Sequence, residues 1–201
     1  NDQLQTELKF LKSQYHPHFL FNALNTVYFQ IDESNKAPRR TLEMISELLR
    51  YQLYGGNQKV SILQEIDYLK TYIALRKLRM SERLRLRVEF PPELNELEIY
   101  PLLFLPLVEN AFKYVGGDYQ LDIIMKWENN RISLFIRNSI PELSAEDEAL
   151  RKSVDERQRK GIGLVNLRRR LSLLYPNKHR LETRKEETEF VAELMIEIED
   201  I

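Results

Sequence analysis

The spacing of apolar residues predicts helices in the first 80 residues of the chain. Apolar positions recur there every three or four residues, as on one face of a helix, for example at Leu20, Leu24, Val27 and Ile31. Pro17 interrupts the pattern and marks a kink or a new start. A polar break over 32–38 and the run Gly55-Gly56-Asn57 separate the helices that follow, which we expect at about 17–31, 38–54 and 62–79.

From residue 83 the apolar period shortens to about 2, which indicates strands. Four segments alternate apolar and polar side chains: 84–90, 121–127, 131–137 and 190–198. The segments 101–115 and 162–175 keep helical spacing, and the charged stretch 141–160 predicts a long loop. The fold class is therefore α+β, with a helical domain over 1–82 and an α/β domain over 83–201. An antiparallel pair of helices cannot bury both of its apolar faces alone, so we expect a homodimer with a four-helix bundle.

Composition excludes several classes of protein. The 30 Lys and Arg residues balance 31 Asp and Glu residues to a net charge of -1, which argues against nucleic-acid binding through a broad basic face. The absence of Cys excludes a disulfide framework and a Cys-ligated zinc site. No apolar run reaches the ~20 residues that a membrane span needs. Because the sequence opens in a helical pattern without an initiator Met, we expect it to be a piece of a longer protein.

The first candidate site is the segment His16-Pro17-His18-Phe19-Leu20-Phe21-Asn22-Ala23-Leu24-Asn25. His18, Asn22 and Asn25 lie at i, i+4 and i+7 and form a polar line on an otherwise apolar and aromatic helix. A histidine in such surroundings is often a satisfied core or interface residue. The functional alternative is an imidazole that accepts a phosphoryl group, since a neutral imidazole is a nucleophile near neutral pH.

The second candidate site lies on the predicted helix 101–115. Its apolar face is formed by Leu105, Val108 and Phe112, whereas Glu109, Asn110 and Lys113 emerge on the other side within one turn. Carboxylate and amide oxygens suit a hard cation, and an ammonium suits phosphate, so this group fits a Mg²⁺-nucleotide. The same three side chains would also be ordinary on a solvated helix face.

The third candidate site is a pair of glycines at the start of the segment with helical spacing, 162–175. Gly161 and Gly163 precede an amphipathic helix with apolar positions at Leu164, Leu167 and Leu171. Glycines and a helix N-terminus together favour phosphate. The spacing matches neither a Rossmann nor a P-loop fingerprint, and alone it would mark only a loop that leads into a helix.

Taken in order, the three segments resemble the catalytic core of LytS-type sensor histidine kinases. The phosphoacceptor sequence of that family is similar to Pro17-His18-Phe19-Leu20-Phe21-Asn22, its asparagine box to residues 107–114, and its second glycine box to residues 161–167. The resemblance spans nearly the whole chain. It implies a dimeric phosphoacceptor bundle followed by an ATP-binding α/β sandwich of the type found in gyrase and Hsp90.

The resemblance also implies roles for single residues. His18 would be phosphorylated. Asn22 would orient a water during removal of phosphate from a partner, or would only complete the polar line with Asn25. The nucleotide contacts would come from residues of the two boxes and the strand between them: Asn110 as the Mg²⁺ ligand, Glu109 in support of that site, Lys113, Tyr114, Asn138, Gly161, Gly163 and Leu164.

Two positions depart from the pattern of the family. Pro106 stands where related ATPases carry an acidic or amide residue, four positions before Asn110. The Asp-x-Gly-x-Gly box is replaced by residues 135–139, so Asn138 stands where an Asp normally accepts a hydrogen bond from the adenine amine. An amide accepts this bond without charge assistance, which about halves its strength, and weaker ATP binding is expected.

The reaction implied is transfer of the γ-phosphoryl group of Mg-ATP to His18, and from there to an aspartate of a response regulator on a separate chain. The family context also implies a cytoplasmic location, as part of an inner-membrane sensor whose membrane segment lies outside these residues. The alternative is a catalytically weak pseudokinase that signals as a nucleotide-binding dimer through conformation alone. Both readings require ATP binding, but only the kinase places acid-labile phosphate on His18.

Overall fold

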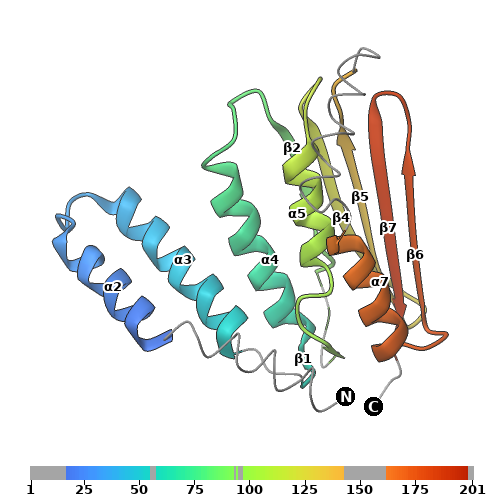
Figure 1. Ribbon diagram of the computed structural model, residues 1–201, viewed down its shortest axis with the longest axis horizontal. Coiled ribbons are helices and arrows are strands. Elements are labelled where there is room, and N and C mark those ends of the chain that lie inside the picture. The colour runs from blue at the N-terminus through green and yellow to red at the C-terminus, as the bar shows by residue number, and fades with distance from the viewer. Residues whose placement is uncertain (1–16, 55–57, 93, 95–96, 143–161, 199–201) are drawn as a thin grey trace.

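The computed structural model describes residues 17–54, 58–92, 94, 97–142 and 162–198. Figure 1 shows a sheet with helices layered beside it. In chain order the elements are α2 (Pro17–Gln30), α3 (Lys36–Tyr54), β1 (Val60–Ser61), α4 (Ile62–Lys77), β2 (Arg85–Glu89), β3 (Glu98–Ile99), α5 (Leu105–Tyr114), β4 (Gln120–Glu128), β5 (Arg131–Ser139), α7 (Ile162–Leu174), β6 (His179–Lys185) and β7 (Glu189–Glu197). The α+β class predicted from the sequence is confirmed.

The main sheet has five strands in the order β2-β4-β5-β7-β6. Strand β2 runs parallel to β4, and the other neighbours are antiparallel. Asn129 and Asn130 join β4 to β5 with φ values of 51° and 59°. Two consecutive residues of positive φ are the mark of a tight hairpin turn, and asparagine tolerates this conformation well.

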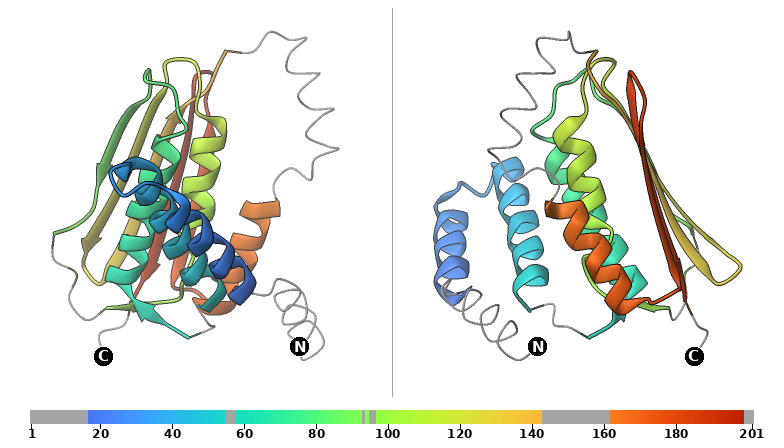
Figure 2. Two further views of the ribbon diagram at one scale, coloured as in Figure 1. Left: turned by 90° about the vertical axis from the view of Figure 1, so that its left-hand side faces the viewer. Right: turned by 45° about the vertical axis from the view of Figure 1, so that its right-hand side comes forward.

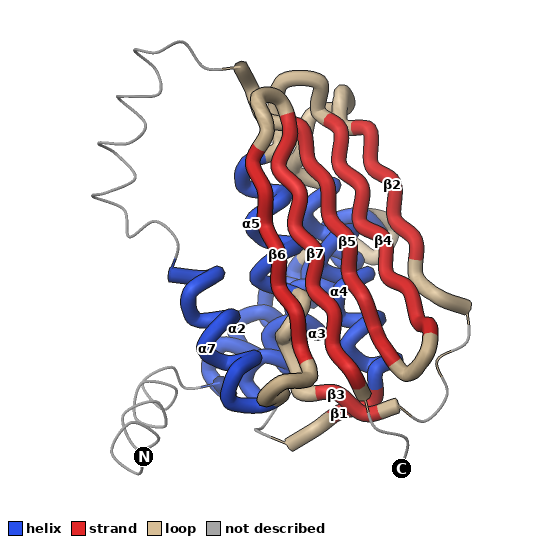
Figure 3. The backbone as a smooth tube through the Cα atoms, turned by 90° about the vertical axis from the view of Figure 1, so that its right-hand side faces the viewer, coloured by secondary structure: helices blue, strands red, loops and turns tan. Residues whose placement is uncertain are grey.

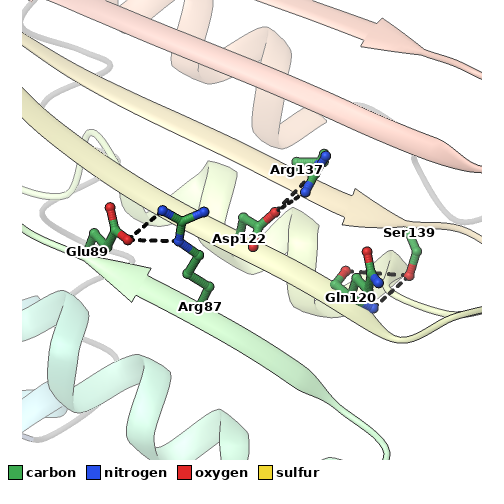
Figure 4. Close-up of polar contacts among 6 residues, drawn as sticks. All are labelled: Arg87, Glu89, Gln120, Asp122, Arg137 and Ser139. Carbon is green, nitrogen blue, oxygen red and sulfur yellow. Dashed lines mark hydrogen bonds and ion pairs between the residues drawn. The ribbon is translucent and has the colours of Figure 1, made fainter.

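One face of the sheet is covered by helices, and the other is open. Helices α4, α5 and α7 lie on the covered face (Figure 2), and the open face is turned toward the viewer in Figure 3. The open face carries ion pairs, among them Arg137 to Asp122 at 2.6 Å and Arg87 to Glu89 at 2.7 Å (Figure 4). This division between a packed and a solvated face explains the alternation of apolar and polar residues along the strands.

Helix α4 joins the core of the sheet. Its N-terminus carries a capping box, with Ser61 accepting from the Leu63 N–H and Gln64 accepting from the Ser61 N–H. The buried residues of the helix belong to the same apolar cluster as strands β4, β5 and β7; they include Ile62, Ile66, Leu69 and Ile73. The domain boundary at 82/83 stays a prediction, and the core of the sheet extends across it.

Helices α2 and α3 form a hairpin on the far side of α4 (Figure 1). Helix α3 buries Met44 and Leu48, whereas no described side chain of α2 is buried. Among the helices that the structure describes, none combines the length and apolar composition that crossing a bilayer requires. The sequence did not predict β6 or the two-residue strands β1 and β3, which pair with each other.

Candidate active site

His18 lies in the first turn of α2 with an exposed side chain. Its Nδ1 is 3.1 Å from Nδ2 of Asn22, one helical turn away. An amide nitrogen only donates, so in this arrangement Nδ1 accepts and the proton of the neutral ring sits on Nε2. Rotating the amide by half a turn presents Oδ1 instead, and the ring then donates from Nδ1 and exposes the Nε2 lone pair. The neighbouring His16 lies outside the described residues.

Helix α5 carries the asparagine box. Leu105, Val108 and Phe112 are buried against the core, as the sequence predicts. Asn110 is half-buried and Lys113 is exposed, with the Lys113 ammonium 5.0 Å from the centre of the Tyr114 ring. Asn110, Lys113 and Tyr114 thus lie on the part of the helix that the core leaves uncovered.

Glu109 lies on a different side of α5 from Asn110, because consecutive residues differ by about 100° around a helix. Its electrostatic neighbours belong to α4: desolvation raises the pKa of the Glu109 carboxyl, and Arg76 opposes this shift. The guanidinium of Arg76 lies 5.7 Å from the centre of the Phe112 ring, and its buried Nε has no hydrogen-bond partner among the described residues. Glu109 is exposed like Lys113, its supporting role at the Asn110 site stays a prediction, and sequence reasoning missed Arg76.

Asn138 is the last residue but one of β5 and is completely buried, with 0% of its surface exposed. It lies on the inner face of the sheet, the same face of β5 that carries Leu134 and Ile136. Its Nδ2 donates to the Ser139 carbonyl at 3.3 Å, while Oδ1 has no hydrogen-bond partner in the described part of the chain. A buried acceptor without a partner is costly, so its presence at a predicted ligand contact points to a donor from a bound molecule.

Hydrogen bonds connect the turn after α5 to the end of β5, beside Asn138. The Ser139 hydroxyl donates to the Gly116 carbonyl at 2.6 Å. It also accepts from the Gln120 N–H at 2.9 Å (Figure 4). Gly117 adopts a φ of +59°, and a Cβ at this residue would lie 2.9 Å from the Ile140 carbonyl oxygen. Glycine is thus required here for the close approach of the two segments. These contacts bring the helix of Asn110 together with Asn138.

Helix α7 begins at Ile162, so it includes Gly163 rather than following both glycines. Gly161 lies outside the described residues, whereas Gly163 is exposed in the first turn of α7, where a Cβ would meet nothing within 4 Å. Leu167 and Leu171 are buried and Leu164 is half-buried, so the predicted apolar face is confirmed. Helix α7 packs against α5 on the covered face of the sheet.

The described residues hold no group of three or more His, Asp or Glu side chains that could bind a metal by themselves. A Mg²⁺ ion bound with a nucleotide keeps several waters and phosphate oxygens and needs only one or two protein ligands. The half-buried amide of Asn110 fits such a role, since it supplies a neutral oxygen.

Comparison with known proteins gives one consistent result. Residues 6–84 match the family model of histidine kinases. Sensor protein kinase HptS of Staphylococcus aureus (strain USA300) is 29% identical over 180 residues, which cover 87% of this chain and 35% of HptS. The chain therefore spans about a third of the length of the curated relatives it matches.

Solved structures give similar matches. The histidine kinase domain of the Erythrobacter litoralis EL346 blue-light activated kinase is 13% identical, with a TM-score of 0.49 and coverage of 98% and 96% of the two chains. ShkA, solved in complex with AMPPNP, is 13% identical with a TM-score of 0.46, over 90% of this chain and 44% of ShkA.

Proposed function

We infer that the chain is the catalytic core of a sensor histidine kinase, as its three motifs predicted, and we propose that it phosphorylates itself on His18 with ATP. The phosphoryl group then passes to an aspartate of a response regulator on another chain. LytS-type kinases remain the subfamily that the motifs resemble.

The observation that carries the proposal is the buried Oδ1 of Asn138. It lies at the place where the family resemblance puts the adenine contact, and no described residue satisfies it. The exocyclic amine of adenine is a donor of the right kind. Nearby, Asn110 and Lys113 of α5 offer an oxygen ligand and a positive charge toward the phosphates.

The transfer itself needs little covalent chemistry from the protein. The bond between the γ-phosphorus and the β,γ-bridging oxygen breaks, a bond from phosphorus to a ring nitrogen of His18 forms, and ADP leaves while the ring gives up its proton. Positioning and neutralisation of charge supply most of the catalysis in such reactions. Mg²⁺ bound with the nucleotide would neutralise phosphate charge, with Asn110 as its protein ligand.

The partners proposed are a second copy of the chain and a receiver domain. The exposed apolar side chains of α2 support the first, and the exposed ring of His18 is open to the second. We place the core in the cytoplasm, where ATP is available, with any membrane segment outside this sequence.

Incubation with γ-labelled ATP and Mg²⁺ tests the proposal. Wild type should acquire acid-labile, base-stable label, and His18→Ala should acquire none. His179→Ala is the matched control, because its Nδ1 hydrogen-bonds the Tyr175 carbonyl in the structure, and it should label normally. Wild type that binds ATP but never labels would instead indicate a dimeric module that signals by conformation.

A further inference from the structure

A carboxyl group is buried completely where α3, α4 and α5 meet. Glu65, in the first turn of α4, has 0% of its surface exposed. Its Oε2 accepts a hydrogen bond of 2.7 Å from the Tyr51 hydroxyl of α3. A glutamate is almost never buried in this way unless charged or polar groups surround it, because desolvation of the carboxylate is expensive.

The surrounding groups come from the segment that leads into α5 and from α7. The backbone amides of Leu102 and Leu103 and the guanidinium of Arg170 all lower the pKa of Glu65, against the larger effect of burial, which raises it. Oε1 nevertheless has no hydrogen bond of normal geometry among the described residues. Leu102 has a φ of 59°, a conformation that is unfavourable in a residue other than glycine and persists only where neighbouring contacts enforce it.

Arg170 holds the same segment through hydrogen bonds to its backbone. It lies on α7 and donates to the Pro101 carbonyl at 2.7 Å and to the Leu102 carbonyl at 3.5 Å. A second contact comes from the end of α7, where the Tyr175 hydroxyl accepts from the Tyr100 N–H at 3.2 Å. Residues 100–103, directly before α5 begins at Leu105, thus interact with Glu65 of α4 and are hydrogen-bonded to Arg170 of α7 and to Tyr175.

Residues 100–103 and Arg170 thus connect α5 and α7, the two helices that carry the proposed nucleotide contacts. Asn110 is less than two turns from the start of α5, and Gly163 is two turns before Arg170 on α7. We propose that Glu65 and Arg170 are positioning residues, which hold α5 against α7 so that the asparagine box and the glycine box face one nucleotide. Tyr51 links this clamp to α3, the second helix of the phosphoacceptor hairpin. The inference rests on the proposed ATP binding and goes beyond it in naming what fixes the geometry of the site.

A purely structural arginine on α7 provides the control. Arg168 also donates to a backbone carbonyl, that of Leu181 at 2.9 Å, and to the Thr183 hydroxyl at 3.4 Å, but both acceptors are on β6. Loss of Arg168 removes a comparable contact of α7 without touching residues 100–103. The two arginines therefore separate loss of stability from loss of positioning.

The experiment compares Arg170→Met and Arg168→Met by titration with Mg-ATP, well below the unfolding temperature of each variant. Arg170→Met should weaken ATP binding about tenfold, as expected when a coupled contact is removed, and Arg168→Met should leave it unchanged. Adding Glu65→Gln to Arg170→Met should restore part of the affinity, because it removes a buried carboxyl left without its cation. Equal affinity in all variants, or an equal loss in both arginine variants, would overturn the inference.

Hydrogen exchange without nucleotide keeps the inference separate from the proposed function. Amides of residues 102–108 should exchange faster in Arg170→Met than in wild type, and at the wild-type rate in Arg168→Met. If wild type binds no ATP, the proposed function fails, and the exchange rates still decide whether the clamp orders the start of α5. Unchanged exchange in Arg170→Met would overturn the clamp even where ATP binds.

Discussion

Asn138 is both completely buried and incompletely hydrogen-bonded, so its side chain should respond sharply to a change of charge. An Asp at this position would accept the adenine amine with charge assistance, a difference of about 1 kcal/mol or roughly fivefold in affinity. Asn138→Asp should therefore bind ATP more tightly in isothermal titration. The same variant should unfold at a lower temperature without nucleotide, because the new carboxyl lacks a donor.

Asn129→Asp, in the exposed β4–β5 turn, is the control for the change of charge and should alter neither quantity. If Asn138→Asp binds ATP no more tightly than wild type, Asn138 does not contact the adenine.

Asn22 is close enough to His18 to act on whatever is attached to the ring, since the two side chains lie 3.1 Å apart. We predict that Asn22 assists removal of phosphate from the partner regulator by orienting a water. Asn22→Ala should retain autophosphorylation, because an uncharged amide leaves the nucleophile intact, while the regulator stays phosphorylated longer. Asn25→Ala, one turn further along α2, should change neither rate. A loss of autophosphorylation as complete as that of His18→Ala would show that Asn22 belongs to the kinase step.

Glu65 should make stability depend on pH in a defined direction. Burial raises the pKa of its carboxyl, so the folded state holds this proton more tightly than the unfolded chain. The resulting contribution to stability is complete below the unfolded pKa of about 4.3 and is lost as pH rises through the folded pKa. Glu65→Gln cannot ionise, so its stability relative to wild type should increase between about pH 4 and pH 8 in urea unfolding. A difference that stays constant or reverses over this range would contradict the raised pKa.

At the scale of elements, the capping box should stabilise α4 measurably. Ser61→Ala removes the side-chain acceptor of the Leu63 N–H and should lower the free energy of unfolding by about 1 kcal/mol. Ser172→Ala removes only a hydroxyl that bonds the Arg168 carbonyl within α7, and should cost less. Equal losses in urea unfolding would mean that the cap adds nothing specific.

The helices and four of the long strands follow from the sequence because each has a strong period of its own. Strand β6 does not, because Leu181 is its one apolar residue and also its one buried residue, so no row of apolar side chains marks a strand. Its identity as a strand comes from pairing with β7 at the edge of the sheet. The two-residue strands β1 and β3 are too short to show a period.

Some residues of the candidate site can likewise be predicted from the sequence, and others cannot. The motifs predict His18, Asn110 and Asn138 because each belongs to a contiguous pattern. The clamp of Glu65 and Arg170 is invisible to such reasoning, since the two residues are far apart in the sequence and meet through the backbone of a third segment. The interaction of Glu109 with Arg76 also depends on the packing of α4 against α5, which no local pattern shows.

At the scale of the whole molecule, α2 leaves large apolar side chains in contact with water. Phe19 and Phe29 are 74% and 78% exposed, and we predict that residues 3–56 form a homodimer that covers this hairpin. Phe29→Asp should shift sedimentation toward the monomer, because it places a charge in the apolar contact. Leu173→Asp, at an equally exposed position of α7, should leave the dimer intact. A wild-type chain that sediments as a monomer at tens of micromolar would contradict the prediction.

Because α4 belongs to the core of the sheet, it must be part of any stable recombinant fragment of the sheet domain. A recombinant fragment that begins at Arg83 would lack Ile62, Ile66, Leu69 and Ile73, all of which are at most 6% exposed. The apolar side chains that these residues cover would then be exposed to water and to other copies of the fragment. It would also lose β1, the only pairing partner that the described strands give to β3. A fragment from Gln58 onward keeps both, and its losses from the core are limited to α3 residues such as Leu48 and Tyr51. The shorter piece should therefore collect in inclusion bodies, while the longer one should stay monodisperse and serve for crystallisation with nucleotide.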